Sequence, residues 1–260
     1  MRSLAHLRLR RLIAGRLQFM KVYAHRGYSG KYPENTMLAF RKAVEAGCDG
    51  VEMDVQLTRD GEVVVIHDEL VDRTTDGKGY VKDYSLAELK KLDASRVRPG
   101  EWGPQEIPTF DEFCAWLKTV DISANVELKT SIIYYPEIEK KCVEIIRKYG
   151  IENRILFSSF NHVSMLNVKK IAPEIPTGAL VEIEGLMYAG YYCEQNGMQY
   201  YHPDFCLLSK EAVEECKAHG IGINVWTVND LDSFEKLVEW GVEGVITNYP
   251  KVLYGWLNRQ

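Results

Sequence analysis

The sequence predicts a (β/α)8 barrel that carries a small inserted subdomain. From residue 20 onward, short runs rich in β-branched residues alternate with helical patterns, the order expected of repeated βα units around a parallel sheet. Glycines follow several of the helical patterns, at the place where a left-handed cap favours glycine. A chain of 260 residues is long enough to form one such barrel as a single domain.

The expected elements follow one another along the whole chain. Strands are expected at 20–25, 49–55, 62–66, 122–128, 154–159, 176–181, roughly 199–205, 221–225 and 243–247. Helices are expected at 34–46, 110–119, 136–149, 161–171, 209–219, 231–240 and 250–258. Nine candidate strands therefore compete for the eight places of the barrel. The tyrosine-rich stretch 182–208 has no clear periodicity, so its secondary structure stays open.

Two segments depart from the βα alternation. Residues 68–108 are charged and contain three prolines, so we predict a small subdomain inserted into the 20–260 barrel domain, with a helix-like piece at 86–92. Residues 1–19 carry five arginines and no acid, which predicts a basic N-terminal extension. Its apolar run is too short for a secretory signal, and a basic amphipathic helix on a membrane surface is the alternative.

Composition excludes several classes of function. The net charge is −5, and without residues 1–19 it is −10, which argues against a nucleic-acid-binding protein. No apolar run approaches the roughly 20 residues of a membrane span. The six cysteines show neither zinc nor disulfide spacing, so we expect reduced thiols in the cytoplasm.

The stretch "VYAHRGYSGKYPENT" places His25 and Arg26 at the end of the first strand, before a glycine that lets the backbone turn. Ligands of α/β barrels bind at the carboxyl ends of the strands, so these two side chains are candidate site residues. A plain strand cap is the alternative interpretation.

The stretch "GVEMDVQLTRDGEVVVIHD" gathers further charges. Glu52 and Asp54 lie two apart on a strand, so their carboxylates share a face. If Asp60 and Gly61 form a two-residue turn, Asp54 lies opposite His67 on the neighbouring strand. Two carboxylates this close repel each other unless a cation neutralises them or one of them holds a proton.

Glu127 and Lys129 alternate on a later strand in "NVELK". Taken alone they form a structural ion pair, but with Glu52 and Asp54 they predict a metal site beside a phosphate anchor. Oxygen ligands without cysteine favour Mg²⁺, Ca²⁺ or Mn²⁺. Three carboxylates, two histidines and two cations fit a metal-assisted attack on a phosphodiester, in which the imidazoles transfer protons.

These residues resemble the glycerophosphodiester phosphodiesterase family. The similarity runs from Met20 to the end of the chain, through "AHRG" with "PENT", "VEMDVQLTRDGEVVVIHD", "NVELK", "FSSF", "NVWTVN" and "GVITNYP" in this order. It implies a barrel of the TIM type and hydrolysis of a small-molecule glycerophosphodiester to sn-glycerol 3-phosphate and an alcohol. The resemblance assigns residues as follows: His25 and His67 to proton transfer, Arg26 and Lys129 to phosphate, Trp226 to a wall beside the substrate, and Glu52, Asp54 and Glu127 to a divalent cation.

Several alternatives remain open in the sequence. Trp226 could instead fill the barrel core. The nucleophile could be water or the substrate's own glycerol hydroxyl. A related barrel enzyme acting on lysophospholipids would need an apolar rim near the site, and a non-catalytic phosphate-binding scaffold would bind without turnover. Head-group preference and oligomeric state have no signal in the sequence.

Overall fold

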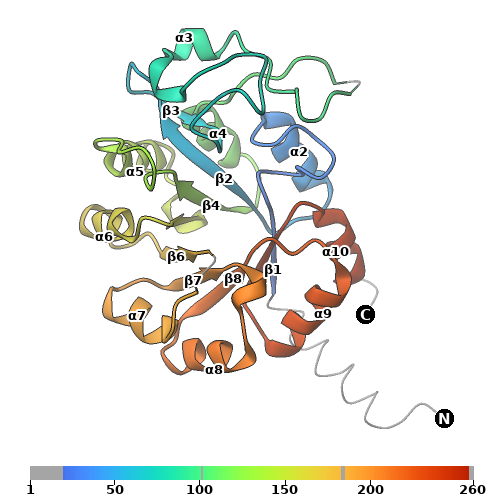
Figure 1. Ribbon diagram of the computed structural model, residues 1–260, viewed down its shortest axis with the longest axis vertical. Coiled ribbons are helices and arrows are strands. Elements are labelled where there is room, and N and C mark those ends of the chain that lie inside the picture. Colours follow the sequence, from blue (N-terminus) through green and yellow to red (C-terminus); the bar gives the residue numbers. More distant parts are fainter. Residues whose placement is uncertain (1–19, 101, 183–184, 258–260) are drawn as a thin grey trace, which may run out of the picture.

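The structure is a closed barrel of eight parallel strands surrounded by helices (Figure 1), as the sequence predicts. It is a computed structural model, and it describes residues 20–100, 102–182 and 185–257. Each strand pairs in parallel with the next in the order β1, β2, β4, β5, β6, β7, β8, β9, and β9 pairs with β1 to close the ring. These strands are β1 (Lys21–Ala24), β2 (Gly50–Leu57), β4 (Ser123–Leu128), β5 (Ile155–Ser159), β6 (Thr177–Val181), β7 (Tyr200–Pro203), β8 (Gly222–Val225) and β9 (Gly244–Thr247).

The helices form the outer layer, with one helix after each barrel strand or its hairpin. They are α2 (Met37–Glu45), α4 (Phe110–Leu117), α5 (Ile138–Tyr149), α6 (His162–Ile171), α7 (Ala189–Gln195), α8 (Lys210–Ala218), α9 (Leu231–Trp240) and α10 (Pro250–Leu257). Helix α7 lies in the stretch that the sequence left open. Short 3-10 turns lie at η2 (Glu152–Arg154) and η3 (Phe205–Leu207). None of the described helices is long and apolar enough to cross a membrane.

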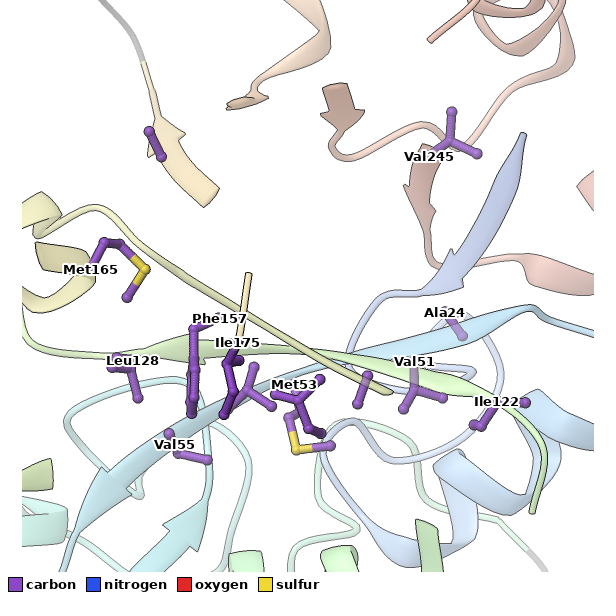
Figure 2. Close-up of a cluster of buried hydrophobic side chains, with 14 of the residues drawn as sticks. Ala24, Val51, Met53, Val55, Ile122, Leu128, Phe157, Met165, Ile175 and Val245 are labelled. Carbon is purple, nitrogen blue, oxygen red and sulfur yellow. The ribbon is translucent and has the colours of Figure 1, made fainter. Parts of the chain in front are cut away.

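The main core lies between the strands and the helices, and it fixes which way each strand faces. On β2, Val51, Met53 and Val55 pack outward with side chains from β4, β5 and α6, including Phe157 and Met165 (Figure 2). Because successive strand residues point to opposite faces, this packing turns Glu52, Asp54 and Gln56 into the barrel. Burying the apolar face therefore sets the direction of the carboxylates.

Strand β3 (Val63–Val65) stands outside the ring, antiparallel to β2, and resolves the excess of candidate strands. The expected register of its hairpin was wrong. The strands pair Val55 with Val65, and Thr58 bonds to Glu62 across a three-residue loop in which Gly61 has φ +81. A three-residue loop shifts the pairing by one residue relative to a two-residue turn, so the partner of Asp54 is Ile66. His67 reaches the site because the chain leaves the ladder after β3.

The segment after β3 lies beside the end of the β2–β3 hairpin (Figure 1), and its side chains build a second, smaller apolar cluster with the hairpin. The cluster includes Val64 and Ile66 from the hairpin and Val71, Val81 and Leu89 from the following segment. The segment contains the turn η1 (Val81–Asp83) and helix α3 (Leu86–Leu89), shorter than the helix-like piece expected at 86–92. The expected N-terminal extension, 1–19, lies outside the described residues.

Helix α2 begins at Met37, three residues later than expected. Asn35 adopts a left-handed conformation with φ +55, and the side chain of Thr36 caps the helix by accepting from the N–H of Ala39. Glu34 and Asn35 are thereby left out of the helix. Their side chains are free to face the carboxyl ends of β1 and β2.

Candidate active site

A cavity of about 500 Å³ opens at the carboxyl ends of the barrel strands. The structure brings seven of the eight predicted site residues to its walls, namely His25, Arg26, Glu52, His67, Glu127, Lys129 and Trp226. The eighth, Asp54, is fully buried next to this wall and contacts Arg26. Residues from β1, β2, β4 and β8 therefore meet in one place although they are far apart in the sequence.

Three buried carboxylates form the centre of the site. Glu52, Asp54 and Glu127 each offer an oxygen atom, and these atoms lie within 4.8 Å of one another. Burial, reinforced by the charges of Asp54 and Glu127, raises the pKa of Glu52 well above its usual range. Burial and Asp54 together raise the pKa of Glu127 to about 7. Such shifts are the cost of placing like charges together away from water.

Asp54 behaves differently from its two neighbours. Burial alone would raise its pKa, but the nearby His67, Arg26 and Lys129 hold the pKa of this carboxyl well below its usual range. Its Oδ2 atom accepts a hydrogen bond from Asn35 at 2.8 Å, whereas its buried Oδ1 atom has no partner. Buried carboxylate oxygens are normally satisfied. Three converging carboxylates and one orphaned oxygen fit a divalent cation with hard oxygen ligands.

Arg26 ties the first strand to this cluster. Its backbone is left-handed, with φ +53, and its N–H donates to Glu52 Oε2 at 2.9 Å. Its guanidinium group lies 3.6 Å from Asp54 Oδ2 and donates to Glu34 Oε1 at 2.8 Å. The following Gly27 has φ +76 and lies so close to the backbone of Ala39 that no Cβ would fit. The glycine is therefore required where the chain turns away from the site.

His25 presents one ring nitrogen to the cavity. Its Nδ1–H donates to Asn248 Oδ1 at 2.7 Å, an oxygen that also accepts from Ser29 at 3.0 Å. This hydrogen bond leaves the lone pair on Nε2, which lies 3.9 Å from Glu52 Oε2. Burial, and then the charge of Arg26, lowers the pKa of His25 to about 4. The imidazole is thus neutral near pH 7 and able to accept a proton.

His67 has different surroundings. Its Nδ1 atom lies 2.6 Å from Asp68 Oδ1, and its Nε2 atom lies 3.2 Å from Lys129 Nζ. Lys129 also pairs with Glu127 at 3.0 Å. Burial alone would raise the pKa of Asp68. The hydrogen bonds that His67 and Arg73 donate to this carboxylate instead hold its pKa below the usual range. The Asp68 carboxylate accepts from the Nδ1–H group and thereby orients the ring.

Arg73 connects the two sides of the site, a role that the sequence analysis did not predict. It donates to Asp68 through Nε at 2.6 Å and Nη2 at 2.9 Å, and to Glu34 through two nitrogens at 2.8 Å each. Asp68 holds His67 and Glu34 holds Arg26, so one guanidinium braces both. Forked Arg–carboxylate pairs fix geometry as well as charge. Arg73 lies in the irregular segment after β3, where no periodicity marks a contact.

Gln56 is a second contributor that the sequence analysis missed. Its Nε2 atom donates to the carbonyls of Ile66, His67 and Asp68 at 2.8–3.1 Å, and its Oε1 atom accepts from Tyr135. Gln56 continues the alternation of Glu52 and Asp54 along β2. That spacing was the signal by which Gln56 could have been predicted to face the site. Its side-chain amide holds the backbone of His67 in place.

Trp226 forms an apolar wall on the opposite side of the cavity. Its indole N–H donates to the carbonyl of His202 at 2.9 Å, and its ring packs edge-on against Phe160 with centroids 5.7 Å apart. Phe160 and Leu180 line the cavity beside it. The alternative of a core-filling role does not describe its position, because Trp226 borders the cavity.

The closed barrel, with carboxylates, imidazoles and cations gathered at the carboxyl ends of its strands, has the architecture and inventory of a barrel phosphodiesterase. A model of the glycerophosphoryl diester phosphodiesterase family matches residues 25–252. The chain belongs to this family, and it is an enzyme of the phosphoric diester hydrolase class.

Individual relatives agree with this membership. The chain is 43% identical to a glycerophosphodiester phosphodiesterase of Caldanaerobacter subterraneus subsp. tengcongensis, over 89% of this chain and 95% of the relative. It is 40% identical to a glycerophosphodiester phosphodiesterase of Bacillus altitudinis, over 88% and 95% of the two chains. The structure of an Oleispira antarctica phosphodiesterase in complex with the product sn-glycerol-3-phosphate is similar, with a TM-score of 0.84, 31% identity and coverage of 94% and 99%.

The raised pKa of Glu127 predicts a pH-dependent stability of the protein in EDTA. Its pKa is about 7 in the folded state against an ordinary 4.5, so the folded state binds the proton more tightly. This contribution is complete below about pH 4.5 and is lost as the pH rises through 7. In urea unfolding, the free energy of unfolding of the wild type should fall between pH 5 and pH 8. In Glu127→Gln this fall should be smaller, by on the order of 2 kcal/mol. The exposed Glu144→Gln is the control, and an unchanged pH dependence in Glu127→Gln would contradict the prediction.

Proposed function

We propose that this enzyme hydrolyses glycerophosphodiesters to sn-glycerol 3-phosphate and an alcohol, with a divalent cation at Glu52, Asp54 and Glu127 and with His25 and His67 as the proton-transfer pair. The observation that carries the proposal is the buried cluster of three carboxylates, with the orphaned Oδ1 of Asp54, between two histidines in unlike surroundings. Family membership and the product named for the Oleispira relative support the choice of substrate class.

The cation would be Mg²⁺, Ca²⁺ or Mn²⁺, because its candidate ligands are all carboxylate oxygens. When bound, it would supply positive charge that neutralises a phosphate oxygen and offsets the repulsion among the carboxylates. Arg26 and Lys129 both line the cavity. Both donate hydrogen bonds suited to the remaining phosphate oxygens.

The unlike surroundings of the two histidines support different roles for them in the proposed reaction. His25 is neutral with its Nε2 lone pair available, so it takes the proton from the nucleophile, whether this is water or the neighbouring glycerol hydroxyl. His67, which the Asp68 carboxylate orients, gives a proton to the oxygen of the departing alcohol. The bond between that oxygen and phosphorus then breaks. Trp226 supports the apolar side of the substrate.

Location is part of the proposal. All six cysteines are free thiols and five are buried, which supports a reducing compartment, and we place the enzyme in the cytoplasm.

The first experiment is the release of sn-glycerol 3-phosphate from glycerophosphocholine and glycerophosphoethanolamine, with each metal and with EDTA. Activity should require a divalent cation, and Asp54→Asn should lower kcat/KM by at least about 100-fold, because it removes charge from the cation site. Glu144→Gln, an exposed acid, should behave as the wild type. Full activity in EDTA, or an active Asp54→Asn variant, would overturn the metal-dependent proposal.

A leaving-group comparison tests the assignment of the histidines. His67→Ala should lower turnover of the choline diester by about 10²- to 10⁴-fold, since the alkoxide leaves poorly without an acid. The loss should be much smaller for a glycerophosphodiester of p-nitrophenol, which leaves without protonation. His25→Ala should impair both substrates alike. If the p-nitrophenyl diester rescued His25→Ala instead, the two roles would be reversed.

Arg73 should act as a positioning residue. Arg73→Gln releases both Asp68 and Glu34, so kcat/KM should fall by about 10- to 100-fold. Arg73→Lys keeps the charge but loses the forked geometry, so it should restore activity only in part. Steady-state kinetics beside circular dichroism separate this effect from unfolding. Wild-type kinetics in Arg73→Gln would show that the bracing is dispensable.

A further inference from the structure

Exposed apolar side chains gather at the mouth of the active-site cavity. Among the described residues, the six large hydrophobic side chains with the greatest exposure are Ile132, Tyr134, Val163, Met187, Tyr188 and Tyr191, at 53–82%. All six follow the carboxyl ends of three consecutive strands, β4, β5 and β6, so they lie at the end of the barrel that holds the site. We call these six residues the apolar rim. Large apolar side chains exposed at one end of a fold are candidates for an interaction surface.

Hydrogen bonds join the three loops that carry the rim. Asn161 Nδ2 donates to the carbonyl of Thr130 at 3.2 Å, and Thr130 bonds to Ser164 at 2.7 Å. His162 Nε2 donates to the carbonyl of Leu180 at 2.9 Å, and its Nδ1 accepts from Tyr192 at 3.0 Å. The helices that follow these loops, α5, α6 and α7, lie in a row on one side of the barrel (Figure 1). These hydrogen bonds hold the described parts of the segments after β4, β5 and β6 together.

The rim is continuous with the cavity. Ile132 is 77% exposed and also lines the cavity, together with Phe160, Leu180 and Trp226. Ile132 thus presents apolar surface both to the cavity and to the outer surface. A protein partner seated on Ile132 would close this mouth, whereas a fluid lipid surface covers apolar side chains and still presents phosphodiester head groups to the opening.

We propose that the apolar rim docks the enzyme on a zwitterionic lipid surface. Tyrosine beside aliphatic side chains suits the boundary between water and acyl chains, because the ring is apolar and the hydroxyl stays wet. The net charge of −10 on residues 20–260 opposes docking on an anionic surface. Docking would bring chain-bearing glycerophosphodiesters to the cavity. This consequence rests on the proposed function, whereas the docking itself does not.

The test measures co-sedimentation of the full chain with phosphatidylcholine vesicles. Uncharged vesicles are used because the five arginines of residues 1–19 would attract anionic ones. The rim variant is Tyr134→Ser/Val163→Ser/Met187→Ser, which leaves the cavity-lining Ile132 intact. It should partition at least about tenfold more weakly than the wild type, because three apolar side chains no longer leave water.

The matched control is Tyr80→Ser/Ile171→Ser/Val252→Ser, three exposed apolar positions outside the rim. It should bind vesicles as the wild type does, and the rim variant should hydrolyse dissolved glycerophosphocholine at the wild-type rate. Absence of vesicle binding by the wild type, or equal binding by the rim variant, would overturn the proposal. Concentration-dependent dimerisation that the rim variant abolishes would overturn it in favour of a second copy. Vesicle binding by a wild type that lacks diesterase activity would refute only the proposed function.

Discussion

Electrostatic repulsion among Glu52, Asp54 and Glu127 is the constraint on which the rest of the site depends. Each carboxylate is nearly inaccessible to water, and burial raises the pKa values of two of them. Neighbouring groups compensate only in part: His67, Arg26 and Lys129 hold the pKa of Asp54 low, while one oxygen of Asp54 stays without a partner. Replacing three carboxylates by apolar residues would be the stable solution for a barrel interior. The cation that we propose at this cluster offsets that repulsion.

The barrel provides what this cluster needs. Packing of Val51, Met53 and Val55 against the helix layer forces the alternate residues of β2 inward, and the parallel pairing of β2 with β4 sets Asp54 beside Glu127. The same hydrophobic burial that stabilises the fold thus holds two like charges at fixed positions. Stability elsewhere in the barrel offsets the local cost of the site.

The segment after β3 helps to position the side chains of the site. Its own apolar cluster anchors it to the β2–β3 hairpin, and Arg73 extends from it to Asp68 and Glu34. Through these two carboxylates it steadies a histidine and an arginine that come from different strands. A segment outside the βα alternation therefore contributes to the geometry of the barrel mouth.

The sequence predicted what depends on local periodicity. The βα alternation predicted the barrel. The spacing of two along β2 and β4 predicted that Glu52, Asp54, Glu127 and Lys129 are candidate site residues. The predicted hairpin register was wrong because Gly61 closes a three-residue loop. The residues of the turn alone do not decide between a two-residue and a three-residue loop. The role of Arg73 could not be predicted because its partner Glu34 is 39 residues away in an irregular region. Long-range side-chain contacts leave no periodic signal.

We propose that the three carboxylates coexist because they share one divalent cation. Isothermal titration of the metal-free protein with Mn²⁺ tests this proposal. One site per chain is expected, lost in Asp54→Asn and retained in the exposed Glu144→Gln. Folded, catalytically active protein that binds no Mn²⁺, Mg²⁺ or Ca²⁺ would contradict it.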